Sequence, residues 1–206
     1  LHFPPHTIHY NNDRINHAGT IIITSPSITN RYHLRPIILP ATAKGRVQAL
    51  TYLPKPQHQT TSLPFQVINV YLQSGNLPAE RARQLDTLLS LTPSRYLFLT
   101  GDFNFIESPS DSSGDSASLI GGAHLDQWTN LQDHLQVSEI HQSTHTYYRH
   151  SENLTSSHTS RLDRVYASYD TDDLEVLTPT TYIPHTTINA LQRASNHSPA
   201  PDHLPV

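Results

Sequence analysis

The chain has 206 residues, enough for one domain of ordinary size that buries a continuous hydrophobic core. Its formal net charge of -4 excludes a broadly basic surface that holds long nucleic acid by counterion release, so any nucleic-acid contact should be local. Cysteine is absent, which excludes disulfides and thiolate metal sites, and no apolar run reaches the roughly 20 residues of a membrane helix. We therefore expect one domain without a membrane span.

The N-terminal third predicts an irregular lead-in and three strands. Residues 1–18 contain Pro4-Pro5 and show no periodicity, which indicates irregular structure. Residues 19–24 are apolar and β-branched and predict a strand buried on both faces. Residues 46–53 and 65–71 predict two more strands, joined as a hairpin by the polar segment between them.

Two helices and further strands are predicted in the rest of the chain. Residues 78–91 begin with a proline, which the first helical position tolerates, and carry an apolar stripe at helical spacing. Residues 96–100 predict a buried strand that stops at Gly101-Asp102, and residues 124–135 predict a helix with Trp128 in the core. Strand-like segments follow at residues 144–149, 161–168 and 181–183. This order is typical of a layered α/β domain.

Gly101-Asp102-Phe103-Asn104 follows a predicted strand. A glycine lets the backbone turn there, and an Asp and an Asn two residues apart can point the same way. A carboxylate beside an amide can hold a water or a hard cation at the end of a strand. The alternative is an Asx turn, in which both side chains satisfy loop backbone.

Two other acidic positions also adjoin predicted strands. Asp163 interrupts a strand and needs a partner, for which we expect Arg161, Arg164 or a histidine; the alternative is an ordinary surface ion pair. Asp202 and His203 are adjacent where another strand begins, and at a loop end both side chains can reach one pocket. By itself the Asp202-His203 pair is weak evidence.

Taken together and in this order, the motifs resemble the endonuclease/exonuclease/phosphatase superfamily, the DNase I-like proteins. The matching segments are Gly-Thr-Ile-Ile-Ile-Thr from Gly19, Asn69-Val70-Tyr71, Leu-Phe-Leu-Thr-Gly-Asp-Phe-Asn from Leu97, Thr146-Tyr147, Arg-Leu-Asp-Arg-Val-Tyr from Arg161 and Asp-His-Leu-Pro-Val from Asp202. The resemblance implies a four-layer α/β sandwich, with two packed mixed sheets flanked by helices, over residues 19–206. It also implies that these loops meet at one rim.

The resemblance implies a role for each matching polar residue. Asp102 would orient or deprotonate the attacking water, and Asn104 would hold that water and the phosphate. Asp163 would fix the imidazole of His203, which would stabilise the charge that develops on the phosphorus centre. Tyr71 would donate to a phosphate oxygen, its alternative being an aromatic ring packed into the sheet.

Magnesium, or manganese, is the cation implied by this chemistry, with Asp202 and Asp102 as ligands. Carboxylates hold such an ion while it keeps several waters and neutralises phosphate charge. Zinc is disfavoured because the chain has no thiolate and its clustered ligands are carboxylates.

The match fails at both ends of the chain. Members of the superfamily begin with a strand that bears an Asn, a helix, and a strand whose Glu binds the metal, but no glutamate precedes Glu80 here. The chain opens on Leu1 and contains no methionine, so we interpret it as a fragment that lacks the N-terminal part. Pro201 stands where a Ser is usual, and a final strand normally continues past Val206.

The leading hypothesis is a metal-dependent phosphodiester hydrolase, in particular a DNA endonuclease of a non-LTR retroelement. One alternative is a phosphatase or a sphingomyelinase-type phosphodiesterase of the same superfamily, for which the nearest basic cluster is Arg31, Arg35, Lys44 and Arg46. Another is a catalytically dead fragment without the glutamate. We expect a monomer inside the cell, in the nucleus or cytoplasm.

Overall fold

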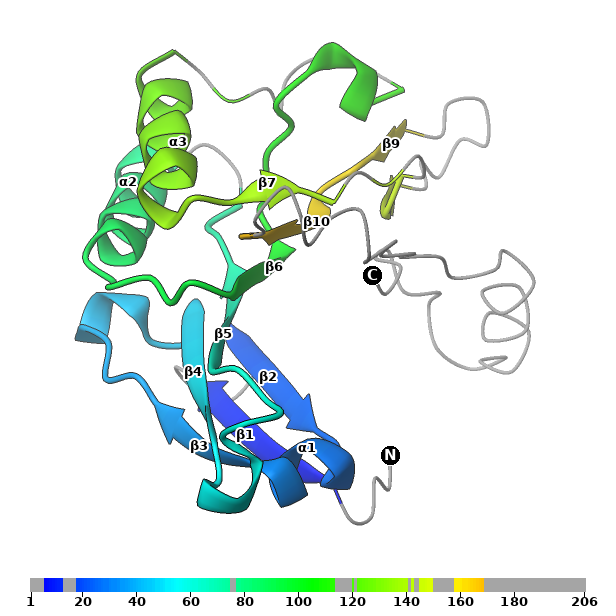
Figure 1. The fold of residues 1–206 in the computed structure, drawn as a ribbon. Coiled ribbons are helices and arrows are strands. Elements are labelled where there is room, and N and C mark those ends of the chain that lie inside the picture. Colours follow the sequence, from blue (N-terminus) through cyan, green and yellow to red (C-terminus); the bar gives the residue numbers. More distant parts are fainter. Residues whose placement is uncertain are drawn as a thin grey trace, which may run out of the picture.

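The structure, a computed structural model, describes residues 6–12, 18–74, 77–113, 120, 122–140, 142, 145–149 and 158–168. In this part of the chain a six-stranded mixed sheet has two helices on one face and a two-stranded hairpin on the other (Figure 1). The predicted α/β class is thereby confirmed. The hairpin is antiparallel, so among the described residues only one of the two packed sheets is mixed.

The large sheet has the strand order β3-β4-β5-β6-β10-β7. Its strands are β3 (Tyr32–Pro36), β4 (Val47–Pro54), β5 (Phe65–Tyr71), β6 (Leu97–Asp102), β7 (Ser138–Glu139) and β10 (Asp163–Ala167). Among the described strands only β5 and β6 are parallel neighbours, and the helix α2 (Pro78–Leu89) connects them. The predicted β4–β5 hairpin is confirmed.

The main core lies between this sheet and the helices α2 and α3 (Gly122–Leu135), both of which form within two residues of their predicted limits. Trp128 is fully buried, as predicted, and meets Phe103, Phe105 and Tyr166 edge-to-face at ring-centroid distances of 5.1–5.5 Å. Such pairs add to the hydrophobic gain from burial. Phe103, which directly follows Asp102, therefore anchors the loop after β6 in the core.

The hairpin of β1 (Thr7–Asn12) and β2 (Gly19–Thr24) corrects two predictions. An irregular lead-in over residues 1–18 is wrong for Thr7–Asn12, because those residues pair with β2 along its whole length. β2 is also not buried on both faces, because only one side of the hairpin packs on β4 and β5. Ile21 and Ile23 are consequently 49% and 43% exposed, whereas Ile22 is buried.

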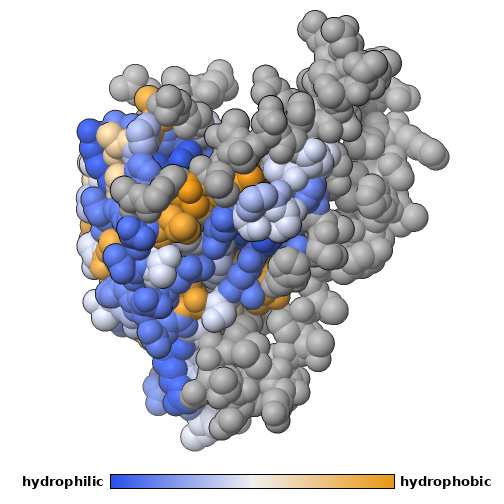
Figure 2. Space-filling model, turned by 90° about the horizontal axis from the view of Figure 1, so that it is seen from above, coloured by the Kyte–Doolittle hydropathy of each residue, from blue (hydrophilic) through white to orange (hydrophobic). Residues whose placement is uncertain are grey.

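The remaining elements are short. They are α1 (Pro26–Arg31), the 3-10 turns η1 (Ala41–Ala43), η2 (Pro56–His58) and η3 (Pro109–Asp111), and the strand pair β8 (Tyr147–Arg149) and β9 (His158–Ser160). The predicted strand at residues 181–183 lies outside the described residues. Within them, no helix has the length and apolarity to cross a membrane. Among the coloured residues of the face seen in Figure 2, most are hydrophilic, and the apolar ones form small separate patches.

Candidate active site

Four residues form a row across one end of the large sheet, which we call the polar row. Tyr71 ends β5 and pairs with Asp102 at the end of β6, and Asp102 pairs with Asp163 at the start of β10. Arg46 extends the row beside β4, because its carbonyl accepts from the Tyr71 N–H at 2.7 Å. Directly paired residues on neighbouring strands are about 5 Å apart and point to the same face. The register thus brings together three of the predicted site residues.

Gly101 has a different role from the one predicted. β6 continues through it to Asp102 and does not stop at residue 100. Its φ is +130°, and a Cβ would lie 2.0 Å from the Val70 carbonyl oxygen. Glycine is required here because the two parallel strands approach so closely, not because the chain turns.

Asp102 and Asn104 are joined by two hydrogen bonds. The Asn104 backbone N–H donates to Asp102 Oδ1 at 2.8 Å, and its side-chain Nδ2 donates to Asp102 Oδ2 at 2.9 Å. Nδ2 also donates to the Leu72 carbonyl at 2.9 Å, and Asn104 takes a φ of +52°, which asparagine tolerates. The Asx turn considered as the alternative is therefore present, and it orients both carboxylate oxygens of Asp102.

Arg46 is a candidate site residue that sequence reasoning weighed only as part of a possible headgroup cluster. Its guanidinium lies 4.6 Å from the centroid of the Tyr71 ring, and Nη1 donates to the Tyr71 carbonyl at 3.3 Å. Asn11 holds the chain on either side of Arg46, donating to the Val47 carbonyl at 2.6 Å and accepting from the Gly45 N–H at 3.1 Å. Apart from that cluster, the sequence placed Arg46 only as the first residue of the predicted strand 46–53, whereas β4 begins at Val47.

Asp163 is 9% exposed and is held at the start of β10 by its neighbours. The buried Thr146 hydroxyl accepts from the N–H groups of Leu162 and Asp163 at 3.2 and 2.9 Å. The Phe103 N–H donates to the Leu162 carbonyl at 3.0 Å, which ties the segment to the loop after Asp102. The start of β10 and the end of β6 are thus connected beyond their strand pairing.

Asp202 and His203, predicted as a metal ligand and a catalytic residue, lie outside the described residues, so their roles stay predictions. Among the residues that the structure does describe, no three His, Asp or Glu side chains gather closely enough to hold a metal. Asp102 and Asp163 nevertheless place two carboxylates on neighbouring strands. Carboxylate oxygens are the ligand type that Mg²⁺ and Mn²⁺ prefer, so the donors present fit such an ion.

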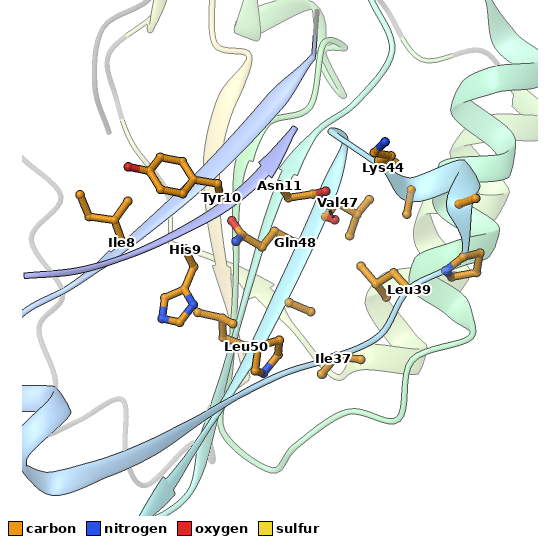
Figure 3. Close-up of a pocket in the computed structure, with 15 residues that line it drawn as sticks. Ile8, His9, Tyr10, Asn11, Ile37, Leu39, Lys44, Val47, Gln48 and Leu50 are labelled. Atoms are coloured by element: carbon orange, nitrogen blue, oxygen red, sulfur yellow. Dashed lines mark hydrogen bonds between the residues drawn. The ribbon is translucent and has the colours of Figure 1, made fainter. Parts of the chain in front are cut away.

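A cavity of about 500 Å³ lies away from these carboxylates, between β1, β4 and the segment of residues 36–44 (Figure 3). Ile8, His9, Tyr10 and Asn11 all line it. Alternate residues of a strand face opposite ways, so a cavity on one face of β1 would contact only every second residue. Four consecutive lining residues therefore indicate that the cavity lies along the outer edge of β1. It contains no member of the polar row, so it is a feature of the sheet edge rather than the candidate active site.

Two solved structures resemble this chain in fold. The endonuclease domain of TRAS1, a telomere-specific non-LTR retrotransposon, is 14% identical, with a TM-score of 0.57 over 84% of this chain and 71% of that domain. The 3′ phosphatase NExo from Neisseria, bound to a product DNA hairpin, is 17% identical, with a TM-score of 0.51 over 73% of this chain and 62% of that protein. The chain thus spans less than two thirds of the Neisseria protein. No protein-family model matches the sequence, and no curated protein matches it significantly.

These likenesses confirm the fold that the motifs predicted. The chain has the DNase I-like fold. Of the two structures, the retrotransposon endonuclease domain matches the larger share of this chain.

Proposed function

We propose that the chain belongs to a phosphodiester hydrolase that uses Mg²⁺ or Mn²⁺ and cleaves DNA, as the endonuclease of a non-LTR retroelement. The observation that carries the proposal is the polar row, in which Arg46, Tyr71, Asp102 and Asp163 stand side by side at one end of the sheet. It offers one cation and one phenol beside two carboxylates. A phosphodiester needs this combination: donors for its oxygens and a base for the attacking water.

In this proposal the Arg46 guanidinium and the Tyr71 hydroxyl bind the non-bridging phosphate oxygens. Asp102, oriented by Asn104, accepts a proton from the attacking water as its oxygen bonds to phosphorus. The bond from phosphorus to the leaving oxygen breaks, and that oxygen takes a proton from solvent. Asp163 holds His203 beside the developing charge. A bound Mg²⁺ or Mn²⁺, held by Asp102 and Asp202, would supply neutralisation of the phosphate.

DNA is favoured over a multiply charged headgroup on two grounds. The polar row contains a single cation, Arg46, which suits one phosphodiester better than several phosphomonoesters. Of the two structures compared above, one is bound to a product DNA hairpin and the other comes from a telomere-specific retrotransposon. A DNA 3′ phosphatase is the second candidate, because one of them is such an enzyme. We further propose that the protein acts as a monomer inside the cell.

The test is nicking of supercoiled plasmid by the full-length protein with Mg²⁺, with Mn²⁺ and with EDTA. Asp102→Asn should lower the rate about 10²–10⁴-fold, the usual contribution of a general base. Arg46→Gln and His203→Ala should also slow nicking, whereas the exposed controls Asp126→Asn and Arg83→Gln should not. Equal nicking by the wild type and Asp102→Asn would sink the proposal. Release of phosphate from a 3′-phosphorylated strand without nicking would favour the phosphatase.

A further inference from the structure

A buried ionic cluster lies next to the polar row, between β10 and the loop that follows Asn104. We call it the Asp111 cluster, and its members are Glu107, Asp111, Glu139, Arg161 and Arg164. Arg164 is fully buried, and Arg161 and Asp111 are 6% and 4% exposed. So much buried charge needs an explanation, because removing charges from water costs more than a simple ion pair returns.

Asp111 is the centre of the cluster. Its Oδ1 accepts from Arg161 Nε at 3.0 Å and Nη2 at 2.7 Å, and its Oδ2 accepts from the N–H groups of Glu107 and Ser108, both at 3.1 Å. Burial by itself would raise the pKa of Asp111. The hydrogen bonds from Arg161 and Ser108 and the charges of both arginines outweigh burial, so this pKa lies below its ordinary value. The carboxylate therefore stays ionised and keeps its donors in place.

The two arginines reach the same loop from either side of Asp163. Arg164 Nη1 donates to Glu107 Oε1 at 3.0 Å, and its Nη2 donates to the Phe105 carbonyl at 2.9 Å. The Arg161 N–H donates to the Asp111 carbonyl at 2.8 Å, and the Arg161 guanidinium also pairs with Glu139 on β7. The loop after Asn104 is thus bound to the segment that carries Asp163 at two points. Arg164 binds it one residue after Asp163, and Arg161 two residues before.

We infer that the Asp111 cluster positions Asp163 relative to Asp102 and Asn104. The loop of residues 103–113 begins at the Asp102–Asn104 pair, and the segment of residues 161–164 carries Asp163. The pairing of β10 with β6 ends at these two residues, where Asp163 pairs with Asp102. Beyond it, the Phe103–Leu162 backbone hydrogen bond and the hydrogen bonds of Arg161 and Arg164 to this loop hold the two segments together. Apolar packing there would stabilise as well but would not set a direction. The two charge-assisted hydrogen bonds from Arg161 to Asp111 Oδ1 do set one. The inference rests on the proposed function of Asp102 and Asp163.

The first test is a double-mutant cycle on plasmid nicking by the full-length protein. Asp111→Asn should lower kcat at least about tenfold while KM for DNA stays within about twofold. In an Asp163→Asn background it should lower kcat less than about twofold further, because the residue that it positions is already disabled. Equal factors in both backgrounds would overturn the inference and leave the cluster a purely structural role. Leu85→Ala, in the core under α2, is the matched control for general destabilisation, and its factor should be equal in both backgrounds.

The second test does not depend on catalysis. Hydrogen–deuterium exchange should rise in residues 102–106 and 161–164 together in Asp111→Asn, with β5 unchanged. If Asp111→Asn does not fold, Glu107→Gln, whose side chain is 27% exposed, should show a smaller rise in the same two segments. Unchanged exchange in both segments would overturn the inference even if the wild type nicks DNA. A wild type that does not nick DNA would instead contradict the proposed function, and exchange would still decide whether the cluster couples the two segments.

Discussion

The two faces of the large sheet are covered in different ways. Under α2 and α3 the side chains of Leu88, Leu99, Trp128 and Tyr166 are completely buried in one continuous cluster. On the other face the described hairpin buries a smaller cluster around Ile22 and exposes part of its own outer surface. Stability should therefore come mainly from the helix-covered face, whereas the polar row lies at the end of the hairpin-covered face. The candidate active site thus lies on the face where packing is less complete.

The largest effect should come from Trp128→Ala, which empties the centre of the helix-covered face. We expect a loss of about 3–5 kcal/mol in the free energy of unfolding, measured by urea denaturation. The ring contacts with Phe103, Phe105 and Tyr166 all disappear. Trp128→Phe should cost clearly less, because it keeps an aromatic ring; an equal loss for both would contradict ring packing as the cause.

Gly101→Ala should be next, at about 3 kcal/mol, because it adds a Cβ at a φ of +130° and against the Val70 carbonyl. It should also reduce nicking strongly, since Asp102 follows directly. Denaturation together with the nicking rate checks both effects. Gly45→Ala, at a second glycine with positive φ (+70°) but outside the strands, is the control for the stability loss only, because Gly45 precedes Arg46. If Gly101→Ala nicks DNA at the wild-type rate, the close approach of β5 and β6 does not determine the geometry of the site.

On the hairpin-covered face, Ile22→Ala should cost about 2 kcal/mol, near the lower limit for such a truncation. Ile22 is 8% exposed and packs with Leu50 and Tyr52, so the cavity can partly fill with solvent. Thermal or urea denaturation measures the loss. A cost equal to that of Trp128→Ala would contradict the difference between the two faces.

The buried charge predicts an acid-dependent loss of stability. The pKa of Asp111 is lowered in the folded protein, so its contribution is fully present above the unfolded pKa of about 4. It is lost as the pH falls from there through the lowered folded pKa. The difference in unfolding free energy between the wild type and Asp111→Asn should therefore shrink as the pH drops below about 4. A difference that stays constant with pH would mean that Asp111 is not ionised.

The smallest effect should come from the outer side of the hairpin. Ile23→Thr should change the free energy of unfolding by less than about 0.5 kcal/mol, because Ile23 is 43% exposed and threonine keeps the β-branch. The same denaturation experiment measures it. A loss above about 1 kcal/mol would mean that this side is covered in the full-length protein.

The sequence could predict the regular elements whose hydrophobic pattern was strong. β5 formed at its predicted limits, α2 and α3 within two residues, and Trp128 lies in the core. Each depends on local periodicity, which is visible in a single segment. β1 was not predicted because its residues are held by pairing with β2, and a local sequence pattern does not show that a partner strand is present.

By itself the sequence predicted which groups would carry the proposed chemistry, because Asp102, Asn104, Asp163 and Tyr71 all belong to motifs attached to predicted strands. Only the tertiary structure decided how they meet, because strand register sets which residues stand side by side, and register depends on pairing between distant segments. For the same reason, the sequence did not assign Arg46 or the Asp111 cluster to the site. The sequence led us to expect Arg161, Arg164 or a histidine as the partner of Asp163. The guanidinium groups of both arginines reach Asp111 instead, 50 and 53 residues away in the chain.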